Sequence, residues 1–401
     1  MEVSMTRKEK IELWMLCFVS AFSILMWATK SSFLYPFQDG MDVNCFFTTG
    51  KSMFRGLVLY RDIYEHKGII VYLIYGLASL IDHTGFIAIF VLEVICQTFF
   101  LYYSYFTIRL FVPGKYYFVL PILSFVVCSG YGFSYGGQVE ELALPILAWG
   151  FSLFMEYMQR DDGTELTMGK VFLCGFWSGI LFWMKYTLTG LFLALVLIMF
   201  ILKLKEKKYK LLGKYAMSFI FGFGLVTIFV LAYFIYHHAL KDLWQVYFHN
   251  LLFNYNARDV GMSRLEYSIR KVLLTFWRNK RFSLLVVLGV IWATCSSVVK
   301  RRTKISLWIV CLITTIAIFY STQYNRYWGL VLAVFAPIGM AALIRYCCKL
   351  KDRKKYGQQS KRKNLMLNSA YVISLIITTI LIRFFGMNTY LLSYHKDYMP
   401  Q

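Results

Sequence analysis

A polar segment near the start of the chain gathers the residues best suited to chemistry. It contains the carboxylates Asp39, Asp42 and Asp62, followed closely by His66 and Lys67. Ionisable groups held at a membrane face cost free energy, so by default they mark a functional site. A carboxylate there could act as a general base, and the cations could hold an anionic group. The segment directly follows a long apolar run, so its location depends on how the rest of the chain folds.

The composition predicts which elements position these residues. The chain has 401 residues, of which 59% are hydrophobic and 16% charged, and its mean hydropathy is +0.56. Apolar runs of about 17–25 residues recur along it, and each is long enough to cross a hydrocarbon core of roughly 30 Å. Because open sheets cannot satisfy their backbone hydrogen bonds in lipid, the runs predict helices. We therefore expect an all-α fold, that of a polytopic helical membrane protein.

The basic residues lie between the apolar runs. The formal net charge of +22 raises the question of a nucleic-acid partner. Lys and Arg residues also cap the cytosolic ends of membrane spans, however, and the charges of this chain sit at such ends. We predict that membrane lipids, and no nucleic acid, meet this charge.

Eleven apolar runs are candidate spans. They are Ile11–Thr29, Gly85–Ile108, Tyr116–Phe133, Val139–Met158, Val171–Lys185, Leu188–Leu202, Tyr215–Tyr236, Phe282–Val299, Ile305–Ser321, Trp328–Tyr346 and Leu365–Phe385. With a cytosolic amino terminus, the short inside segments then hold 26 of the 43 Lys and Arg residues. A twelfth crossing, by the shorter run Gly68–Ile81, would move three basic tracts outside, against the positive-inside bias. We therefore predict that Gly68–Ile81 is a juxtamembrane or re-entrant helix.

This topology predicts a single transmembrane domain over residues 1–401. The amino terminus is expected in the cytoplasm, and the carboxyl terminus on the extracytoplasmic face of the plasma membrane. The external surface then consists mainly of the loop 30–84, the loop 237–281 and the tail 386–401. Within the second loop, cations alternate with apolar residues from Arg264 to Arg281, which is typical of an interfacial amphipathic helix. The candidate chemistry therefore faces outward.

Motifs on this outer face resemble a known superfamily. The first loop places Asp42, Phe46 and Gly50 at four-residue spacing, and Tyr60-Arg61-Asp62 and His66-Lys67-Gly68 follow. Later matches are Tyr135-Gly136-Gly137-Gln138-Val139-Glu140-Glu141, Phe182-Trp183-Met184-Lys185-Tyr186-Thr187, Asn254-Tyr255-Asn256 and Tyr324-Asn325-Arg326-Tyr327. The pattern resembles GT-C glycosyltransferases, most closely the bacterial ones that decorate cell-wall polysaccharides or teichoic acids. Protein O-mannosyltransferases and lipid A aminoarabinose transferases are more distant likenesses. The chain departs from the pattern at Ile69, where proline is common, and in the short tail after Phe385.

The resemblance implies a GT-C-like fold of about eleven transmembrane helices with external juxtamembrane helices. It also implies an enzyme that moves a sugar from a polyprenyl-phosphate donor to a cell-envelope glycan. In such an inverting displacement Asp42 would be the general base, and Asp39 the alternative, holding a metal ion or orienting the loop. Asp39, Asp42 and Glu140 could bind a divalent cation, Mg²⁺ or Mn²⁺. The competing interpretation of both aspartates is a solvated turn.

Cations near the lipid headgroups would bind the donor phosphate. We expect His66, Lys67, Lys185 and Arg326 in this role, although Lys67 could be an interfacial lysine and Lys185 could pair with a buried carboxylate. Asp62, Glu140, Asn254 and Tyr255 are expected to bind the acceptor or to brace the loops.

Two other functions remain open at this stage. A flippase or transporter of lipid-linked sugars predicts polar groups at mid-membrane depth, and here Glu93 is the main candidate for such a group. A non-catalytic homologue is the second alternative. Expected partners are the lipid-linked sugar donor, a cell-wall polysaccharide or teichoic acid acceptor, and a sugar-lipid synthase and a flippase that would supply the donor.

Overall fold

The computed structural model describes residues 5–160, 163–254, 261–320, 323–352 and 361–394. In these residues every regular element is a helix. The first half of the chain forms α1 (Arg7–Ala28), α2 (Met41–Met53), α3 (Ile69–Ile81), α4 (Ile87–Phe111), α5 (Val119–Cys128), α6 (Val139–Gln159), α7 (Met168–Met184), η1 (Tyr186–Thr189) and α8 (Gly190–Lys205).

The second half continues the same pattern of long helices joined by short connections. Its elements are α9 (Tyr209–Tyr236), α10 (Leu240–Leu243), η2 (Trp244–Asn254), α11 (Arg264–Arg278), α12 (Lys280–Cys295), α13 (Arg301–Phe319), η3 (Arg326–Phe335), α14 (Ala336–Asp352), α15 (Lys361–Phe385) and η4 (Thr389–Tyr394). The segment made of η3 and α14 is the most buried of the long helical segments and forms the centre of the bundle.

The predicted membrane spans fall on helices. Six segments of the described residues are long and apolar enough to cross a membrane: Arg7–Ala28, Ile87–Phe111, Tyr186–Lys205, Tyr209–Tyr236, Arg301–Phe319 and Arg326–Cys348. Shorter apolar helices cover four further runs, including the α3 run Ile69–Ile81. The all-α, polytopic helical class is confirmed, while the number of crossings stays a prediction.

The third predicted span is shorter than its apolar run. The run Tyr116–Phe133 was expected to cross, but α5 covers only Val119–Cys128, which is about 15 Å at the usual helical rise. Past Cys128 the sequence is rich in glycine and serine, which are poor helix formers. Residues 129–138 instead form a turn, in which Gly136 and Gly137 adopt φ values of +82° and +69°.

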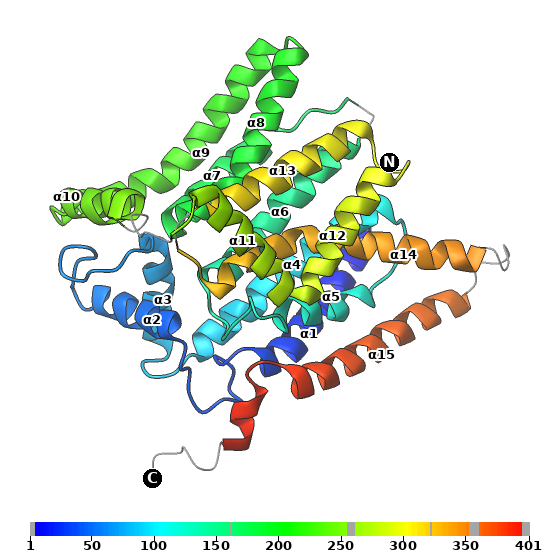
Figure 1. The fold of residues 1–401 in the computed structure, drawn as a ribbon, viewed down its shortest axis with the longest axis horizontal. Coiled ribbons are helices and arrows are strands. Elements are labelled where there is room, and N and C mark those ends of the chain that lie inside the picture. Colours follow the sequence, from blue (N-terminus) through cyan, green and yellow to red (C-terminus); the bar gives the residue numbers. More distant parts are fainter. Residues whose placement is uncertain (1–4, 161–162, 255–260, 321–322, 353–360, 395–401) are drawn as a thin grey trace.

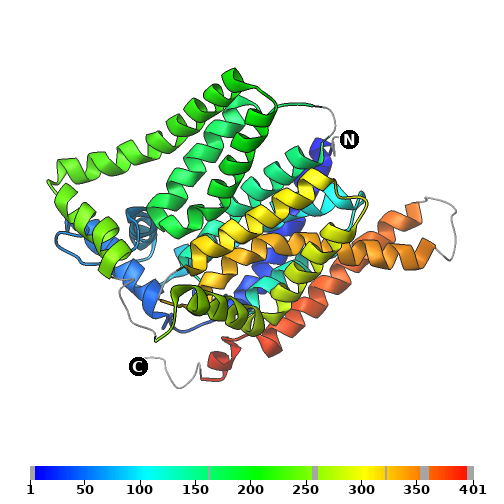
Figure 2. The same cartoon turned by 45° about the horizontal axis from the view of Figure 1, so that its top comes forward.

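The connections gather at two opposite ends of the bundle. In Figures 1 and 2, α2, α3 and α10 lie together at one end, and the start of α1, the end of α14 and the start of α15 lie at the other. We call the first the α2 end. The two long loops meet there, because Arg61 Nη1 donates a hydrogen bond to the His237 carbonyl (2.9 Å). The first loop and the end of α9 are therefore in contact, while the predicted membrane topology stays a prediction.

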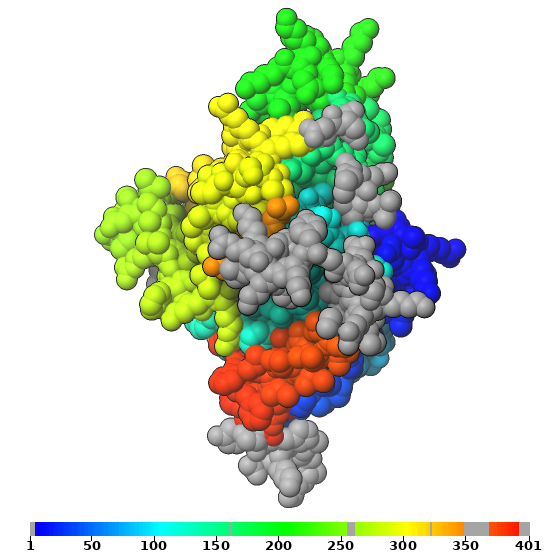
Figure 3. Space-filling view, turned by 90° about the vertical axis from the view of Figure 1, so that its right-hand side faces the viewer, coloured from blue at the N-terminus to red at the C-terminus, as the bar shows by residue number. Residues whose placement is uncertain are grey.

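The end opposite α2 is rich in basic side chains that bind helix ends. Arg302 Nε donates to the Met158 carbonyl at the end of α6 (2.7 Å), and Arg345 Nε donates to the Phe111 carbonyl at the end of α4 (2.9 Å). Such contacts satisfy carbonyls that have no partner within their own helix. Figure 3 faces this side, with the α8–α9 pair above α13 and with α15 below.

The helices α2 and α3 pack closely because both present glycine at their contact. A Cβ atom on Gly50 would lie 2.4 Å from the Tyr72 carbonyl oxygen, and one on Gly76 would overlap the Phe54 ring at the same distance. The start of α3 is held against the end of α7 by the hydrogen bond from Gly68 N to Met184 O (3.0 Å). These contacts join the first loop to the residues around Lys185.

Orientation in the membrane can be tested with single cysteines at the two ends. We expect a membrane-impermeant maleimide to label Tyr64→Cys in intact cells and Lys207→Cys only after permeabilisation, because the basic end should be cytosolic. The background replaces the exposed Cys45, Cys295 and Cys347 with serine. Labelling of Lys207→Cys in intact cells would reverse the orientation.

Candidate active site

Asp42 lies in the first turn of α2 and is held by a tyrosine from the central helix. Tyr327 Oη donates a hydrogen bond to Asp42 Oδ2. The helix start suits an acidic side chain, because the backbone N–H groups there carry partial positive charge. Asp42 is half-buried, so its carboxylate is held in place by the fold and still reaches the surface.

Asp39 has a different partner. Its Oδ1 lies 2.5 Å from Nζ of Lys30, whose side chain is completely buried, while the Asp39 side chain is 41% exposed. The loop between them is fixed locally, since Gly40 N donates to Gln38 Oε1 (3.0 Å) and Asn44 Nδ2 donates to the Gln38 carbonyl (2.7 Å). The two aspartates therefore sit close in sequence but bind separate partners.

The rest of the first loop is braced by its own acids. Val58 N donates to Asp62 Oδ2 (2.8 Å), and Arg61 pairs with Asp62 Oδ1 (2.9 Å). The Arg61 guanidinium and the Val58 N–H lower the pKa of Asp62 to about 2. Burial raises the pKa of Glu65, but hydrogen bonds from His66 and Cys45 outweigh it, so that this pKa falls to about 2. Both acids are thus held as anions that stabilise the loop.

Lys185 forms a buried ion pair at the end of α7. Its Nζ lies 2.5 Å from Glu140 Oε1, and only 1% of the Glu140 side chain is exposed. The same ammonium is 4.4 Å from the centre of the Trp328 ring, in a cation–π contact. Asp42 and Lys67 are also within electrostatic range of Lys185. The ion pair thus lies beside the candidate base.

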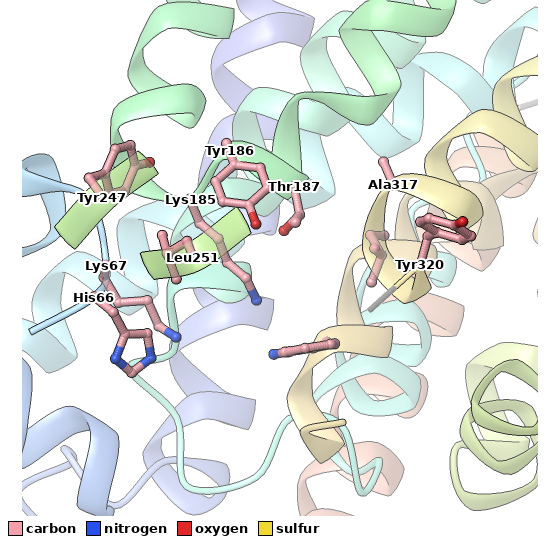
Figure 4. Close-up of a pocket in the computed structure, with 11 residues that line it drawn as sticks. His66, Lys67, Lys185, Tyr186, Thr187, Tyr247, Leu251, Ala317 and Tyr320 are labelled. Carbon is pink, nitrogen blue, oxygen red and sulfur yellow. The ribbon is translucent and has the colours of Figure 1, made fainter. Parts of the chain in front are cut away.

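These residues border a cavity of about 100 Å³. Its lining comes from the first loop, the α7–η1 junction, η2, α13 and η3: His66, Lys67, Lys185, Tyr186, Thr187, Tyr247, Leu251, Ala317, Ile318, Tyr320 and Trp328. Figure 4 shows the amino groups of Lys67 and Lys185 extending into the same space from different sides. We call it the Lys67 cavity.

Two hydrogen-bond donors in this lining have no partner among the described residues. Lys67 is only 7% exposed, yet no carboxylate there pairs with its ammonium. The Trp328 Nε1–H group is also buried, and it donates to no partner among the described residues. Backbone hydrogen bonds from Tyr60 Oη (2.6 Å) and to Tyr72 Oη (3.0 Å) hold Lys67 in position. An ammonium and an indole N–H that face one cavity favour an anionic ligand.

The structure brings some of the predicted residues together and separates others. Of the four cations expected at the donor phosphate, His66, Lys67 and Lys185 line the cavity. Arg326 is not among the lining residues: its guanidinium lies over the rings of Tyr131 and Tyr135, and its role at the donor phosphate stays a prediction.

The residues expected to brace the loops or bind the acceptor are also dispersed. Glu140 pairs with Lys185, and Asp62 pairs with Arg61. Asn254 is exposed at the end of η2 and binds Asn250 Oδ1 (2.8 Å), away from the cavity lining. Tyr255 lies outside the described residues.

Two buried glutamates, Glu93 and Glu141, support the turn 129–138. The sequence did not predict that they would meet at this turn. Gly137 N donates to both Glu93 Oε1 (2.5 Å) and Glu141 Oε2 (2.8 Å), and Thr29 Oγ1 donates to Glu93 (2.8 Å). A Cβ atom on Gly136 would lie 2.0 Å from Thr29 Oγ1, so only glycine fits there. An acid inside an apolar span was the signal for Glu93, but its partners on other helices were not visible in the sequence.

The candidate metal ligands do not assemble into one donor set. Asp39, Asp42 and Glu140 bind Lys30, Tyr327 and Lys185, respectively. Among the described residues, no three His, Cys, Asp or Glu side chains are close enough to share an ion. In this arrangement the three residues do not form a shared donor set, and a divalent cation at Asp39, Asp42 or Glu140 stays a prediction.

The fold of the chain is similar to that of a solved membrane-enzyme structure at low sequence identity. A solved structure of the archaeal oligosaccharyltransferase AglB from Archaeoglobus fulgidus, in complex with an inhibitory peptide and a dolichol-phosphate, matches with a TM-score of 0.50 and 12% identity, covering 98% of this chain and 58% of that one. A second structure of the Archaeoglobus fulgidus oligosaccharyltransferase, tethered to an acceptor peptide, gives a TM-score of 0.47 at 12% identity, covering 99% and 56%. The chain thus spans just over half the length of these proteins.

The sequence itself matches a narrower family. Residues 2–395 match the family described as "Putative competence-induced protein Ccs4 N-terminal domain", and the chain belongs to that family. No curated protein matches the sequence.

The buried ion pair can be tested by a double-mutant cycle. Glu140→Gln or Lys185→Met alone leaves an uncompensated buried charge, which typically costs about 3–5 kcal/mol, and the double variant should recover most of this loss. The free energy of unfolding of the detergent-purified protein measures the effect. As a control, Lys208→Met breaks an exposed pair with Glu165 and should cost less than about 1 kcal/mol. Additive losses in the double variant would show that the two side chains do not stabilise each other.

Proposed function

We propose that this protein is a glycosyltransferase that moves a sugar from a polyprenyl-phosphate carrier to a cell-envelope glycan at the extracytoplasmic face. The acceptor class is a cell-wall polysaccharide or teichoic acid. The GT-C-type fold supports the general class of the reaction. The dolichol-phosphate bound to AglB is a polyprenyl phosphate, the same chemical class as the carrier that we propose for this protein. The local geometry of the α2 end supports the assignment of individual residues.

The observation that carries the proposal is the Lys67 cavity beside Asp42. Burying a cation without a carboxylate is costly, so an anionic ligand is the natural partner of Lys67. Lys185 contributes less net charge, because Glu140 already neutralises it. The cavity opens where the apolar helices end, which is the depth at which the phosphate of a carrier lipid would lie.

The residues can then be assigned to one displacement. The Asp42 carboxylate accepts the proton of the acceptor hydroxyl while that oxygen forms its bond to the anomeric carbon of the sugar. The bond from this carbon to the phosphate oxygen breaks, and the carrier phosphate leaves with the electron pair. Lys67 and the Trp328 N–H stabilise the charge on that phosphate, and Tyr327 keeps the carboxylate oriented. Attack from the side opposite the phosphate inverts the anomeric centre.

The alternative function, a flippase or transporter of lipid-linked sugars, was supported mainly by Glu93 as a polar group at mid-membrane depth. In the structure this side chain is fully buried and bonded to Thr29 and Gly137 at the α2 end. It supports a turn next to the candidate site, an arrangement that favours the enzyme over a flippase. Metal dependence at Asp39 and Asp42 stays a prediction, which chelation followed by Mg²⁺ or Mn²⁺ addition would decide.

The assignment of Asp42 predicts a selective loss of activity. Asp42→Asn should lower sugar transfer by at least about 10²-fold, because general-base catalysis commonly contributes that much, while protein level and unfolding temperature stay near those of the wild type. Purified protein in detergent is assayed with a panel of polyprenyl-phosphate hexoses, and envelope glycans of cells are compared in composition. A flippase would show no transfer in detergent. Full activity of Asp42→Asn would remove this residue from the mechanism.

Replacing Lys67 should lower the activity without lowering the stability of the protein. Lys67→Met should reduce kcat/KM for the donor by tenfold or more, since a hydrogen bond to a charged group contributes roughly 1.5–3 kcal/mol. It should also leave the protein at least as stable, because a buried unpaired charge is removed. Arg55→Gln, at an exposed position of the same loop, is the control. Unchanged donor kinetics in Lys67→Met would separate the cavity from the donor.

A further inference from the structure

A row of alternating cations and aromatic rings lies next to the residues that flank and hold Asp42, because Arg326 precedes Tyr327 and Tyr135 packs on Gly40. Its members are Lys30, Tyr135, Arg326, Tyr131 and Arg278, which we call the cation–aromatic ridge. Lys30 Nζ and the Arg326 guanidinium lie 4.2 Å and 4.3 Å from the Tyr135 ring centre. Arg326 and Arg278 lie 5.5 Å and 5.1 Å from the Tyr131 ring centre. The contacts form one continuous chain across four segments of the sequence.

The ridge is anchored by backbone hydrogen bonds. The turn that carries both tyrosines is tied to the end of α1 by Lys30 N donating to the Tyr135 carbonyl (2.9 Å). On its other side, Gly132 N donates to Asn279 Oδ1 (2.5 Å) at the α11–α12 junction. The rings therefore keep fixed positions, and the cations that stack on them are ordered before any ligand arrives.

The charge of the ridge is only partly neutralised. Asp39 pairs with Lys30. In the described part of the chain, no carboxylate forms an ion pair with Arg326 or Arg278. Arg326 is half-buried and Arg278 is exposed, so both can be reached from solvent. Two guanidinium groups of the ridge thus lack a counter-charge among the described residues.

Stacking of this kind leaves the hydrogen-bonding edge of arginine available. The N–H groups of a guanidinium point outward in the plane of the group. They therefore stay available when its flat face lies on an aromatic ring, and they can bind carboxylate or phosphate oxygens in pairs. Since the tyrosine faces are occupied by cations, the ridge is better suited to acidic groups than to stacking of neutral sugar rings. Its ligand is therefore an anion.

The beginning of η3 links the ridge to the candidate base. Three consecutive side chains point to three different places: Arg326 to the ridge, Tyr327 to Asp42 and Trp328 to the Lys67 cavity. A 3₁₀-helix has three residues per turn, which spreads successive side chains around its axis. Tyr135 also packs on Gly40, since a Cβ atom there would lie 3.2 Å from the ring. Asp42 thus lies between an anion-binding cavity and an anion-binding surface.

We propose that the cation–aromatic ridge binds the acceptor, and that the acceptor is an acidic glycan, with carboxylate or phosphodiester groups along its chain. The inference rests on the proposed function, because it assigns the second substrate of that reaction. Arg326 and Arg278 grip acidic groups of the chain and present a neighbouring hydroxyl to Asp42.

Direct binding tests the ridge without any sugar donor. The full-length protein in detergent is titrated with a fluorescent oligogalacturonate, with a glycerol phosphate oligomer and with a neutral maltooligosaccharide. We expect at least one of the two acidic probes to bind, with an affinity that falls as salt rises, and the neutral probe to bind far more weakly. Arg326→Gln and Arg278→Gln should each weaken binding roughly tenfold. Arg326→Lys should recover only part, since it keeps the charge and loses the fork.

A matched control lies two residues from Arg278. Lys280 is also exposed and also stacks on a ring, that of Trp277 at 4.2 Å, but it is not in the ridge, so Lys280→Gln should bind as the wild type does. Equal loss in Lys280→Gln, equal binding of the neutral probe, or equally tight binding of an oligothymidylate would overturn the proposal. Unfolding temperatures verify that each variant is folded.

Kinetics separate the two proposals. In a working transfer assay, Arg278→Gln should raise KM for the acidic acceptor and leave KM for the donor unchanged. If the wild type transfers sugar to a neutral acceptor as well as to an acidic one, the ridge assignment fails while the glycosyltransferase stands. If the acidic probes bind through the ridge but no donor is ever used, the proposed reaction fails instead.

Discussion

A buried ammonium with no carboxylate partner among the described residues is the constraint around which the α2 end is arranged. Removing a cation from water costs several kcal/mol unless something compensates it, and Lys67 is 7% exposed. The neighbouring Lys185, by contrast, is compensated by the carboxylate of Glu140. Two tyrosines fix the backbone of Lys67 in place. The Lys67 side chain thus borders the cavity from a fixed position.

The central helix distributes the parts of the site. Because η3 winds as a 3₁₀-helix at its start, Arg326, Tyr327 and Trp328 reach three separate surroundings within three residues. The same segment continues into α14 and is almost entirely buried. The most buried of the long helical segments therefore carries the contact that orients the carboxylate of Asp42, which suits a site that needs fixed geometry.

The turn between α5 and α6 positions the aromatic rings of the cation–aromatic ridge, as η3 positions the residues around Asp42. It carries Tyr131 and Tyr135 of the ridge and is tied down by buried acids from two helices, Glu93 and Glu141, which share the Gly137 N–H. Buried polar groups lower the free energy of the fold only where they are bonded, and here the bonds run to the Gly137 N–H and the Thr29 hydroxyl, while Glu141 Oε1 has no partner among the described residues. These bonds fix a glycine-rich segment that could not otherwise hold two aromatic rings at the surface.

The sequence by itself determined the class of fold, because spans are set by the length and polarity of local runs, and both can be counted along the chain. It also located the acids and cations of the first loop, since ionisable groups are conspicuous in an apolar sequence. Partners were decided only by the tertiary structure. Glu140 with Lys185, Tyr327 with Asp42 and Arg326 with Tyr135 join residues far apart in the sequence. Such pairings depend on how helices pack, and helix packing in a bundle is set by side-chain contacts that no local pattern records.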